Sequence, residues 1–283
     1  QPYGDVWLKL RPLIYEKHPY RWATIGKEIS HIEEATMEDV KGFFYKYYLP
    51  NNAVLVIAGD IDIAKTKQLV EKYYGDLESR KIPEKKFPQD AELVKPISKT
   101  IESEVQNTSV LVGYMATEAG HQDGYALDLL ANILGAGSSS RLYKDLVYEK
   151  QKALGVSVHN FGSADPGQFT LMASLKPGVD AKVAEEVFDQ EIKKLQMDRV
   201  SNQELTKAKN LIMKEYVDGL TTISGKANAL ALNEILFSDY KRLFSDLEKY
   251  QEVTAEDVQN VAKKYLKNNR KVTATLNPKA KKK

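Results

Sequence analysis

The order of apolar and polar positions along the chain predicts helices that alternate with short strands. Between residues 5 and 34, apolar residues follow a helical spacing that breaks at His18, because the residue before a proline disfavours the helical conformation. A clear amphipathic helix then starts behind Thr36, which is a favourable N-cap with two acidic residues in the turn that follows. This first part of the chain is therefore mainly helical.

A short apolar run comes after this helix. Residues 53–58 read Ala-Val-Leu-Val-Ile-Ala and stop at a Gly-Asp pair, which predicts a buried strand. A further amphipathic helix is predicted for residues 63–74. Residues 80–96 contain three prolines and several lysines without a sustained apolar period, and this composition is typical of a linker.

The remainder of the chain again mixes both kinds of element. Ser201 and Glu204 form a capping-box pattern at the start of one helix. The turn Asp165-Pro166-Gly167 separates two strands that we expect to pair. The pattern predicts strands within 100–115, at 156–158 and at 168–175, and helices at 123–134, 141–150, 181–197, 201–219, 224–236 and 240–249.

A self-match at a separation of 218 positions is the most informative feature of the sequence. In both copies a capped helix is followed by a Lys-Tyr pair, an asparagine and a β-branched apolar run. The matching residues are Thr36–Val40 with Thr254–Val258, Lys46-Tyr47 with Lys264-Tyr265, and Asn51 with Asn269. Two unrelated helices with a common cap are the alternative explanation. Seven identities in one register favour a duplicated domain instead.

The duplication predicts the fold class and the domain boundaries. We expect an α+β protein, an α/β sandwich, with two homologous domains that each carry a mixed or antiparallel sheet covered by helices. Far more chain precedes the cap in the second copy than in the first, so the first domain is predicted to be truncated at its N-terminus. Residues 1–80 would be the C-terminal half of the first domain, 81–97 the linker, 98–278 the complete second domain and 279–283 a basic tail.

Composition excludes several classes of function. The chain has 283 residues, and 41 basic against 39 acidic side chains leave a net charge of +2. This near-balance gives no electrostatic case for nucleic acid or an anionic membrane surface as a partner. Cysteine is absent, so disulfides, thiolate metal sites and a cysteine nucleophile are excluded. No apolar run approaches the roughly 20 residues that span a bilayer.

Several segments, taken in order, resemble the pitrilysin/insulinase family of zinc peptidases. They are Tyr15–Tyr20, Ile25-Gly26, the helix behind Thr36, Tyr48–Asn52 and Val54–Asp60, followed by Gly137–Tyr143 in the second half. The resemblance spans nearly the whole chain. It implies two similar α/β domains that enclose a cavity in which extended peptides are cleaved.

In that family an inverted His-x-x-Glu-His motif and a distal glutamate supply the zinc ligands and the catalytic base. This sequence lacks that pattern: its histidines are His18, His31, His121 and His159, and none has a second histidine nearby. The resemblance therefore implies that the motif and the distal glutamate lie upstream of Gln1. The intact protein is expected to be a zinc metalloendopeptidase, whereas this chain alone is expected to lack catalytic residues and zinc, and to be inactive.

The resemblance also suggests substrate-binding positions, for which Arg141, Tyr143 and Tyr148 are the candidates. Some family members hold the substrate backbone with an Arg and a Tyr seven positions apart in the second domain. In this sequence Tyr148 stands at the Arg position and Gly155 or Val156 at the Tyr position, so the pair is absent. The intact form would then resemble the zinc subunit of a homodimer or heterodimer. Arg141 could equally anchor its own loop.

The other candidate residues have structural alternatives. His18 in its His-Pro-Tyr turn is expected to be structural, and His31 to lie at the surface. His121, with Glu118 and Asp123 nearby, could hold a metal weakly, although a solvated loop is the better interpretation. His159 suggests no chemistry. The loop 135–140 lacks the lysine and the glycine spacing of phosphate-binding loops, which favours a tight turn.

Three hypotheses about function remain. The first is part of a zinc endopeptidase whose peptide substrates add a strand to a sheet edge. The second is a non-catalytic structural or substrate-binding subunit, since the core proteins of the respiratory bc1 complex resemble this family without needing the metal. The third is an unrelated two-domain binding module. The family resemblance suggests the bacterial periplasm or envelope as the location, with the cytoplasm as the alternative.

Overall fold

The computed structural model describes residues 6–279, so most of the predicted basic tail at 279–283 lies outside the described residues. The described chain forms two compact units. Unit 1 contains residues 6–22, 88–214 and 247–279, and unit 2 contains residues 23–87 and 215–246. The helices α7 (Asn202–Gly219) and α9 (Arg242–Glu252) each start in one unit and end in the other.

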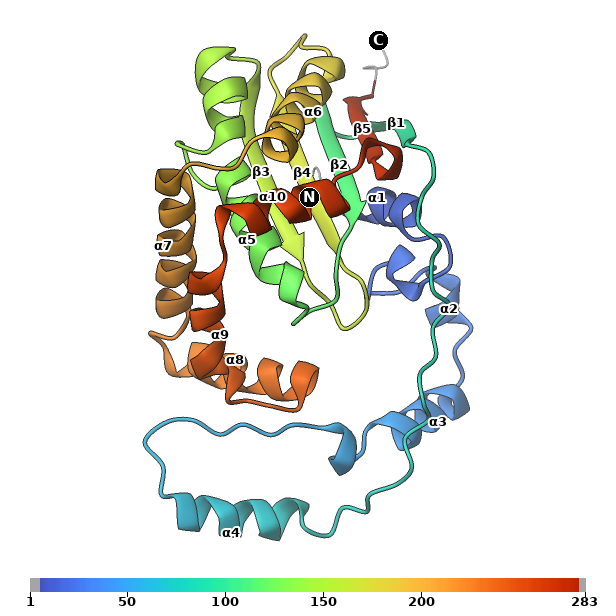
Figure 1. Cartoon of the computed structure of the whole chain (residues 1–283). Helices are drawn as coiled ribbons and strands as arrows, with labels where there is room; N and C mark the ends of the chain where they lie inside the picture. The colour runs from blue at the N-terminus through green and yellow to red at the C-terminus, as the bar shows by residue number, and fades with distance from the viewer. Residues whose placement is uncertain (1–5, 280–283) are drawn as a thin grey trace. The chain divides into compact units, whose positions relative to one another are not determined.

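A five-stranded mixed sheet forms the centre of unit 1 (Figure 1). Its strands, in spatial order, are β1 (Ile97–Ser103), β5 (Val272–Pro278), β2 (Ser109–Met115), β4 (Gln168–Leu175) and β3 (Ala153–Phe161). β1 and β5 are parallel, and all other neighbours are antiparallel. The expected strand pair around the turn at 165–167 is confirmed as β3 and β4.

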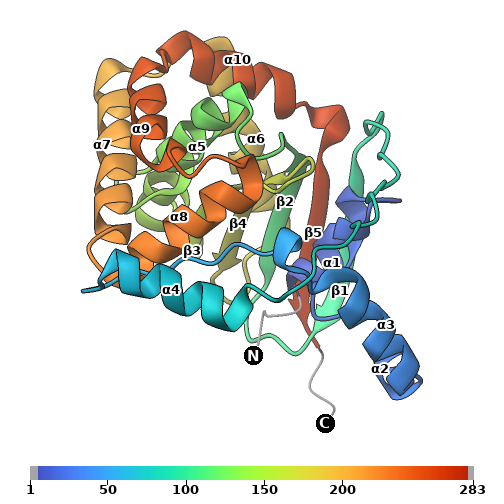
Figure 2. The same ribbon diagram turned by 90° about the horizontal axis from the view of Figure 1, so that it is seen from below.

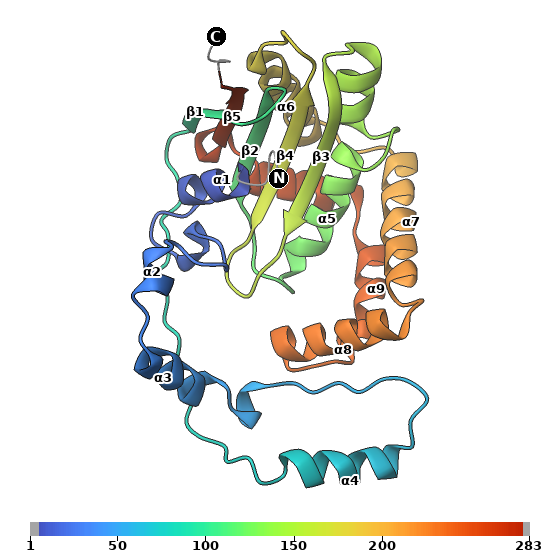
Figure 3. The same ribbon diagram turned by 180° about the vertical axis from the view of Figure 1, so that it is seen from behind.

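Helices cover both faces of this sheet. One face carries α5 (Gln122–Gly135), α6 (Ala181–Met197) and α10 (Ala255–Tyr265), with the π-helix η3 (Tyr143–Glu149) beside β3. The opposite face carries α1 (Val6–Ile14), followed by the short 3-10 helix η1 (Pro19–Arg21). Figure 1 shows α10 in front of the sheet, Figure 3 shows α1 on the other side, and Figure 2 shows the layers from below.

Alternation along the strands produces two cores, because successive side chains of a strand point to opposite faces. Val110, Val112 and Tyr114 of β2 are buried with α5, α6 and α10. Leu111 of the same strand faces α1 and is buried there with Leu10. The sheet is therefore the middle layer of three.

Unit 2 contains helices but no strand among its described residues. Its elements are α2 (Ser30–Glu33), α3 (Met37–Tyr47), the 3-10 helix η2 (Pro50–Asn52), α4 (Ile63–Tyr74), α8 (Ile223–Phe237), and the adjoining ends of α7 and α9. The buried strand predicted at 53–58 is not formed. Ala53, at the start of this run, has an extended conformation. The run has no neighbouring strand with which to pair.

The predicted fold class is confirmed as α+β with one mixed sheet covered by helices. The expectation of a sheet in both copies of the repeat is not met, since the described residues of the first copy carry none. The expected helix at 141–150 is instead a π-helix over Tyr143–Glu149. Within the described residues no helix is long and apolar enough to cross a membrane.

Candidate functional site

The outer edge of β3 is one of the two edges of the sheet in unit 1. β3 is the last strand of the sheet and pairs only with β4 in the part of the chain described. The amide of Leu175 donates to the carbonyl oxygen of Thr108 at 2.9 Å, on the side of β4 that faces away from β3. Hydrogen bonding alternates along an antiparallel strand, so even-numbered β4 residues such as Met172, opposite Ser157, bond to β3.

The register leaves every second residue of β3 directed outward. Val156, Val158 and Asn160 therefore point their amide and carbonyl groups away from β4. No other described segment forms backbone hydrogen bonds with this edge. Leu154 and Phe161 expose large side chains at the two ends of the same strand. An edge of this kind is a template for another extended chain.

A buried carboxylate positions one end of this edge. Asp128 of α5 accepts hydrogen bonds from Asn160 Nδ2 at 2.8 Å and from Tyr250 Oη of α9 at 2.7 Å. Burial raises the pKa of the Asp128 carboxyl group, although both hydrogen bonds act in the opposite direction. Sequence reasoning missed this trio. Its one signal was an acidic residue inside the leucine-rich helix predicted at 123–134.

Arg141 is held by two acidic side chains of neighbouring helices. Its Nε donates to Glu204 Oε1 at 2.7 Å and its Nη2 to Glu204 Oε2 at 3.1 Å, and its Nη1 lies 3.7 Å from Glu191 Oε2. The hydrogen bond from Arg141 is the main reason that the pKa of Glu204 falls to about 2. Ser201 also bonds this carboxylate, which confirms the predicted capping box. The geometry thus shows Arg141 as an anchor.

Tyr143 and Tyr148 lie in the π-helix η3, immediately before β3. Hydrogen bonds in such a helix join residues five apart, as the 2.8 Å bond from Lys150 N to Asp145 O shows. The two tyrosines therefore stand one turn apart. Tyr143 is half-buried, whereas Tyr148 is 77% exposed.

The π-helix leads directly into the edge strand. The amide of Lys152 donates to the carbonyl oxygen of Leu146 at 2.8 Å, which ties the start of β3 to η3. The helix that carries Tyr143 and Tyr148 therefore adjoins the start of β3, and Arg141 fixes the start of the same segment. Substrate binding by these three residues remains a prediction.

Three of the four histidines serve local structure. His18 is buried: its Nδ1 accepts a hydrogen bond from the amide of Tyr20, and its Nε2 lies 3.4 Å from Asp165 Oδ2 in the β3–β4 turn. His121 caps α5, since its Nδ1 accepts from the amide of Asp123 at 3.0 Å. His159 packs against Phe161, with ring centroids 5.3 Å apart.

His31 lies in the short helix α2 of unit 2. The weak metal site considered around His121 is not supported, because its ring nitrogen and the Asp123 carboxylate already have partners. More generally, no group of three or more His, Asp or Glu side chains among residues 6–279 could hold a metal ion. These donors do not fit a zinc centre.

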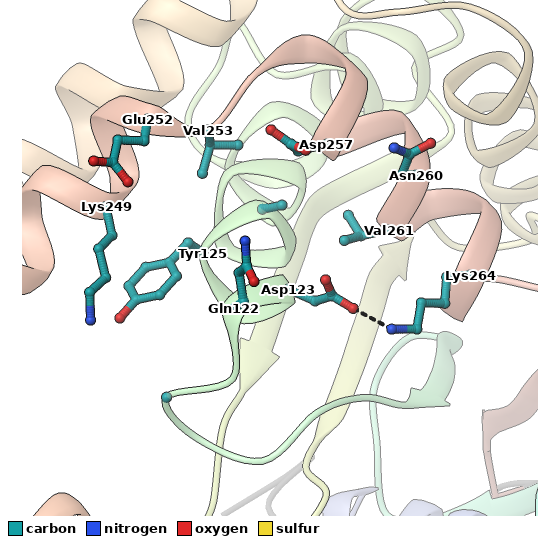
Figure 4. A pocket seen from close by; sticks show the side chains of 12 residues that line it. Gln122, Asp123, Tyr125, Lys249, Glu252, Val253, Asp257, Asn260, Val261 and Lys264 are labelled. Atoms are coloured by element: carbon teal, nitrogen blue, oxygen red, sulfur yellow. Dashed lines mark hydrogen bonds and ion pairs between the residues drawn. The ribbon is translucent and has the colours of Figure 1, made fainter.

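A pocket of about 470 Å³ lies where α5, α9 and α10 meet (Figure 4). Inside it, Asp123 accepts hydrogen bonds from Lys264 Nζ and Tyr265 Oη, both at 2.6 Å. Partial burial by itself would raise the pKa of Asp123, but these two bonds and the Lys264 charge outweigh it and lower the pKa. Burial, followed by the Asp123 contact, raises the pKa of Tyr265 to about 12. The bonds of Asp123 connect α5 to α10 and are structural contacts between the two helices.

The sequence is similar to a known protein family and to several curated proteins. A sequence model of the family described as Peptidase M16 inactive domain matches residues 34–212. The zinc protease PqqE of Helicobacter pylori is 29% identical over 98% of this chain and 63% of its own length. An uncharacterized zinc protease of Bacillus subtilis, YmxG, is 24% identical over 88% of this chain and 59% of its own length. The chain thus spans about three fifths of the length of these curated relatives.

Solved structures share the fold. The crystal structure of a protease from Helicobacter pylori matches 98% of this chain and 68% of its own, with a TM-score of 0.87 and 26% identity. The peptidase M16 inactive domain from Pseudomonas fluorescens matches 100% of this chain and 67% of its own, with a TM-score of 0.83 and 22% identity. These matches confirm the resemblance to zinc peptidases that the sequence motifs indicate.

Proposed function

The chain belongs to the peptidase M16 family, and from this premise we propose that it is the peptide-binding part of a zinc-dependent endopeptidase. A second part of the enzyme holds the metal, since the donors among residues 6–279 do not fit a zinc centre. The two parts together enclose the extended peptide that is cleaved. Residues 1–80 belong, in this proposal, to the latter half of the first peptidase-like domain.

The observation that carries this proposal is the outward-facing edge of β3. An extended peptide placed beside it gains main-chain hydrogen bonds to Val156 and Asn160 regardless of its sequence, whereas Gly135 of α5 lies against the amide of Val158. Each such bond contributes about 0.5–1.5 kcal/mol net, so a few in register bind a peptide measurably. Main-chain recognition of this kind suits a peptidase that accepts many sequences.

The side chains next to the edge refine the proposal. Tyr148 offers an exposed ring at the end of η3, and Tyr143 lies one turn before it. Aromatic rings of this kind pack against apolar side chains of a bound peptide. Arg141 does not contact the peptide in this proposal. Glu204 and Glu191 hold its guanidinium, and this contact fixes the start of η3.

A second candidate function is that of a non-catalytic structural or substrate-binding subunit. The observation that favours it is the description of the matched family as an inactive domain. Both functions use the β3 edge, but only the first requires that peptides be cleaved when this chain is combined with a zinc-bearing partner. Cleavage by the complex, measured with and without a chelator, therefore separates the two.

Peptide binding at the β3 edge is common to both candidate functions, and it can be tested with this chain alone. Replacing Val156 by proline removes one outward amide without removing a bond to β4, and proline is tolerated at such edge positions. Val156→Ala is the matched control, since it shortens the side chain and keeps the amide. Binding of a fluorescein-labelled, unstructured decapeptide is then measured by fluorescence anisotropy.

We expect Val156→Pro to bind the decapeptide about tenfold more weakly than Val156→Ala, a difference of about 1.4 kcal/mol. Both variants should have the same circular dichroism spectrum and similar melting temperatures. Equal affinity of the two variants would show that peptides do not add to this edge, and the proposal would fail.

A further inference from the structure

The segment that contains the His-Pro-Tyr turn is fastened at its backbone by a single carboxylate in unit 1. Asp90, in the segment that precedes β1, accepts hydrogen bonds from the backbone amides of Glu16, Lys17 and His18 at 2.9, 2.6 and 3.1 Å. Hydrogen bonds from backbone amides to an ionised carboxylate are stronger than those between neutral groups. The backbone immediately before η1 is therefore held in place.

The same segment contacts the turn between β3 and β4. The backbone amide of Asp165 donates to Tyr20 Oη at 3.2 Å, and Tyr15 Oη donates to the carbonyl oxygen of Pro166 at 3.0 Å. In addition, His18 Nε2 lies 3.4 Å from Asp165 Oδ2. Because this turn joins β3 to β4, these three contacts hold one end of the hairpin against η1 and the residues before it.

The contacts of the His18 ring require the neutral form with its proton on Nε2. The backbone amide of Tyr20 donates to His18 Nδ1 at 3.2 Å, so Nδ1 must carry a lone pair. This bond makes His18 the N-cap of η1. The remaining ring proton is then on Nε2, which faces the Asp165 carboxylate. Neutral His18 therefore joins η1 and the β3–β4 turn through its two ring nitrogens.

Protonation of this ring breaks one of its two contacts and keeps the other. A protonated imidazole carries a hydrogen on both nitrogens and cannot accept a hydrogen bond. His18 Nδ1 and the Tyr20 amide would then be two donors facing each other across the same 3.2 Å. The hydrogen on Nε2 still points to Asp165, and the added positive charge strengthens that contact. The cap of η1 is thus the contact that is lost.

The surroundings of the ring determine that η1 moves and the ring stays. The side chain of His18 is only 4% exposed, and the rings of Tyr15 and Tyr20 lie with their centroids 6.0 and 4.3 Å from its own. The ring therefore cannot turn into solvent when it takes up a proton. Asp90 also holds the backbone amide of His18, so the residue itself is fixed. The donor that can move away is the Tyr20 amide.

The charges around the ring act in the same direction. Asp165 of the β3–β4 turn and Asp90 of the segment before β1 are the carboxylates that contact His18, and both attract a positive ring. Positive charge nearby comes from Arg11 of α1, which interacts with the hydroxyl of Tyr15, and from Lys17 and Arg21 on either side of the turn. Arg21 donates to the carbonyl oxygen of Glu16 at 2.6 Å.

We propose that His18 is a pH-dependent clasp between η1 and the β3–β4 turn. The neutral ring keeps the clasp closed. When the ring takes up a proton from solvent, it releases the Tyr20 amide, η1 opens, and the bond between the Asp165 amide and the Tyr20 hydroxyl is lost. Histidine is the residue type whose charge changes between about pH 8 and 5, so a fall in pH opens the clasp. This inference does not depend on peptide binding and stands apart from the proposed function.

The test measures hydrogen exchange of the Tyr20 and Asp165 amides by NMR on the full chain, at about pH 7.5 and about pH 5. Rates are expressed as protection relative to the unfolded chain, because intrinsic exchange itself depends on pH. In the wild type, protection of both amides should fall about tenfold or more at the lower pH. In His18→Asn it should change less than about twofold, since the Asn oxygen caps η1 and does not titrate.

His121→Asn is the matched control. His121 caps α5 in the same way, with Nδ1 accepting from the Asp123 amide at 3.0 Å, but its side chain is 35% exposed. This variant should keep the pH effect at Tyr20. A pH effect of equal size in His18→Asn would show that another group titrates, and unchanged protection in the wild type would show that there is no clasp. Either result overturns the inference.

A measurement on the wild type alone covers the case in which His18→Asn does not fold. The nitrogen chemical shifts of the His18 ring report its protonation directly. The midpoint of that titration should coincide with the midpoint at which Tyr20 loses protection. Loss of protection at a clearly different pH would overturn the inference, because the opening of η1 would then not follow the charge on His18.

Discussion

Arg141 and Glu204, 63 positions apart, face each other with two parallel hydrogen bonds and join the start of the π-helix η3 to the first turn of α7. Bidentate pairs between an arginine and a carboxylate are stronger and more directional than ordinary exposed ion pairs. Their position suggests that the conformation of η3, and with it the start of β3, depends on this contact.

The first prediction concerns this pair. Arg141→Ala should lower the free energy of unfolding by about 1.5–3 kcal/mol, because a partly buried carboxylate loses its charged donor. Arg199→Ala is the control: Arg199 pairs with Glu256 at an exposed position, and such pairs contribute only about 0–1 kcal/mol. Urea denaturation of both variants measures the difference. Equal effects would show that Arg141 is not an anchor.

The same carboxylate makes a prediction about pH. The folded-state pKa of Glu204 is lowered from 4.5 to about 2, chiefly by the hydrogen bond from Arg141. A lowered pKa in the folded state stabilises the fold above the unfolded-state pKa, and this contribution disappears as the pH falls through the folded-state value. The stability difference between wild type and Glu204→Gln should therefore be constant near pH 7 and vanish between about pH 5 and 2. A pH-independent difference would contradict this.

A third prediction concerns the buried trio behind the β3 edge. Asp128→Ala should lower the free energy of unfolding by about 1–3 kcal/mol, because Asn160 and Tyr250 lose their shared acceptor. Asp128→Asn keeps an oxygen acceptor and should lose less. Because burial raises the folded-state pKa of Asp128, the ionised group opposes folding as the pH rises above its ordinary value of 3.8. The free energy of unfolding of Asp128→Asn, measured by urea denaturation, should therefore increase relative to that of the wild type as the pH is raised above 3.8.

Local elements were well predicted from the sequence because their signals are local. The helix predicted at 181–197 is α6, with the same bounds, and Thr36 caps α3 as expected. The π-helix was not predicted, since apolar spacing over seven residues does not distinguish it from an α-helix. Asp128 and its partners were missed because they join residues up to 122 positions apart.

The strand predicted at 53–58 failed for a different reason. The run has the composition of a buried strand, and its counterpart β5 is one. A strand, however, exists only beside another strand, and the described residues supply none for this run. Local sequence encodes the extended conformation, whereas the partner decides whether a sheet forms.

A fourth prediction tests how closely α5 approaches the edge strand. A Cβ atom added at Gly135 would lie 2.6 Å from the backbone nitrogen of Val158, so the helix or the strand would have to shift. Gly135→Ala should therefore lower the free energy of unfolding by about 1–3 kcal/mol, as overpacking does. Gly155→Ala is the control in β3, because no atom lies within 4 Å of its added Cβ. Similar melting temperatures for both variants would show that the contact is looser than described.

The last prediction compares the two copies of the repeat within one chain. Tyr265→Phe removes a hydrogen bond to the Asp123 carboxylate and should lower the free energy of unfolding of unit 1 by about 1–2 kcal/mol. Tyr47→Phe makes the same chemical change where no described carboxylate contacts the hydroxyl, so the isolated chain should keep its stability. Hydrogen exchange, read separately for α10 and α3, measures the two effects. If Tyr47→Phe loosened α3 as much as Tyr265→Phe loosens α10, the Lys-Tyr pair would act within its own helix, and the bond to Asp123 would not explain the effect in α10.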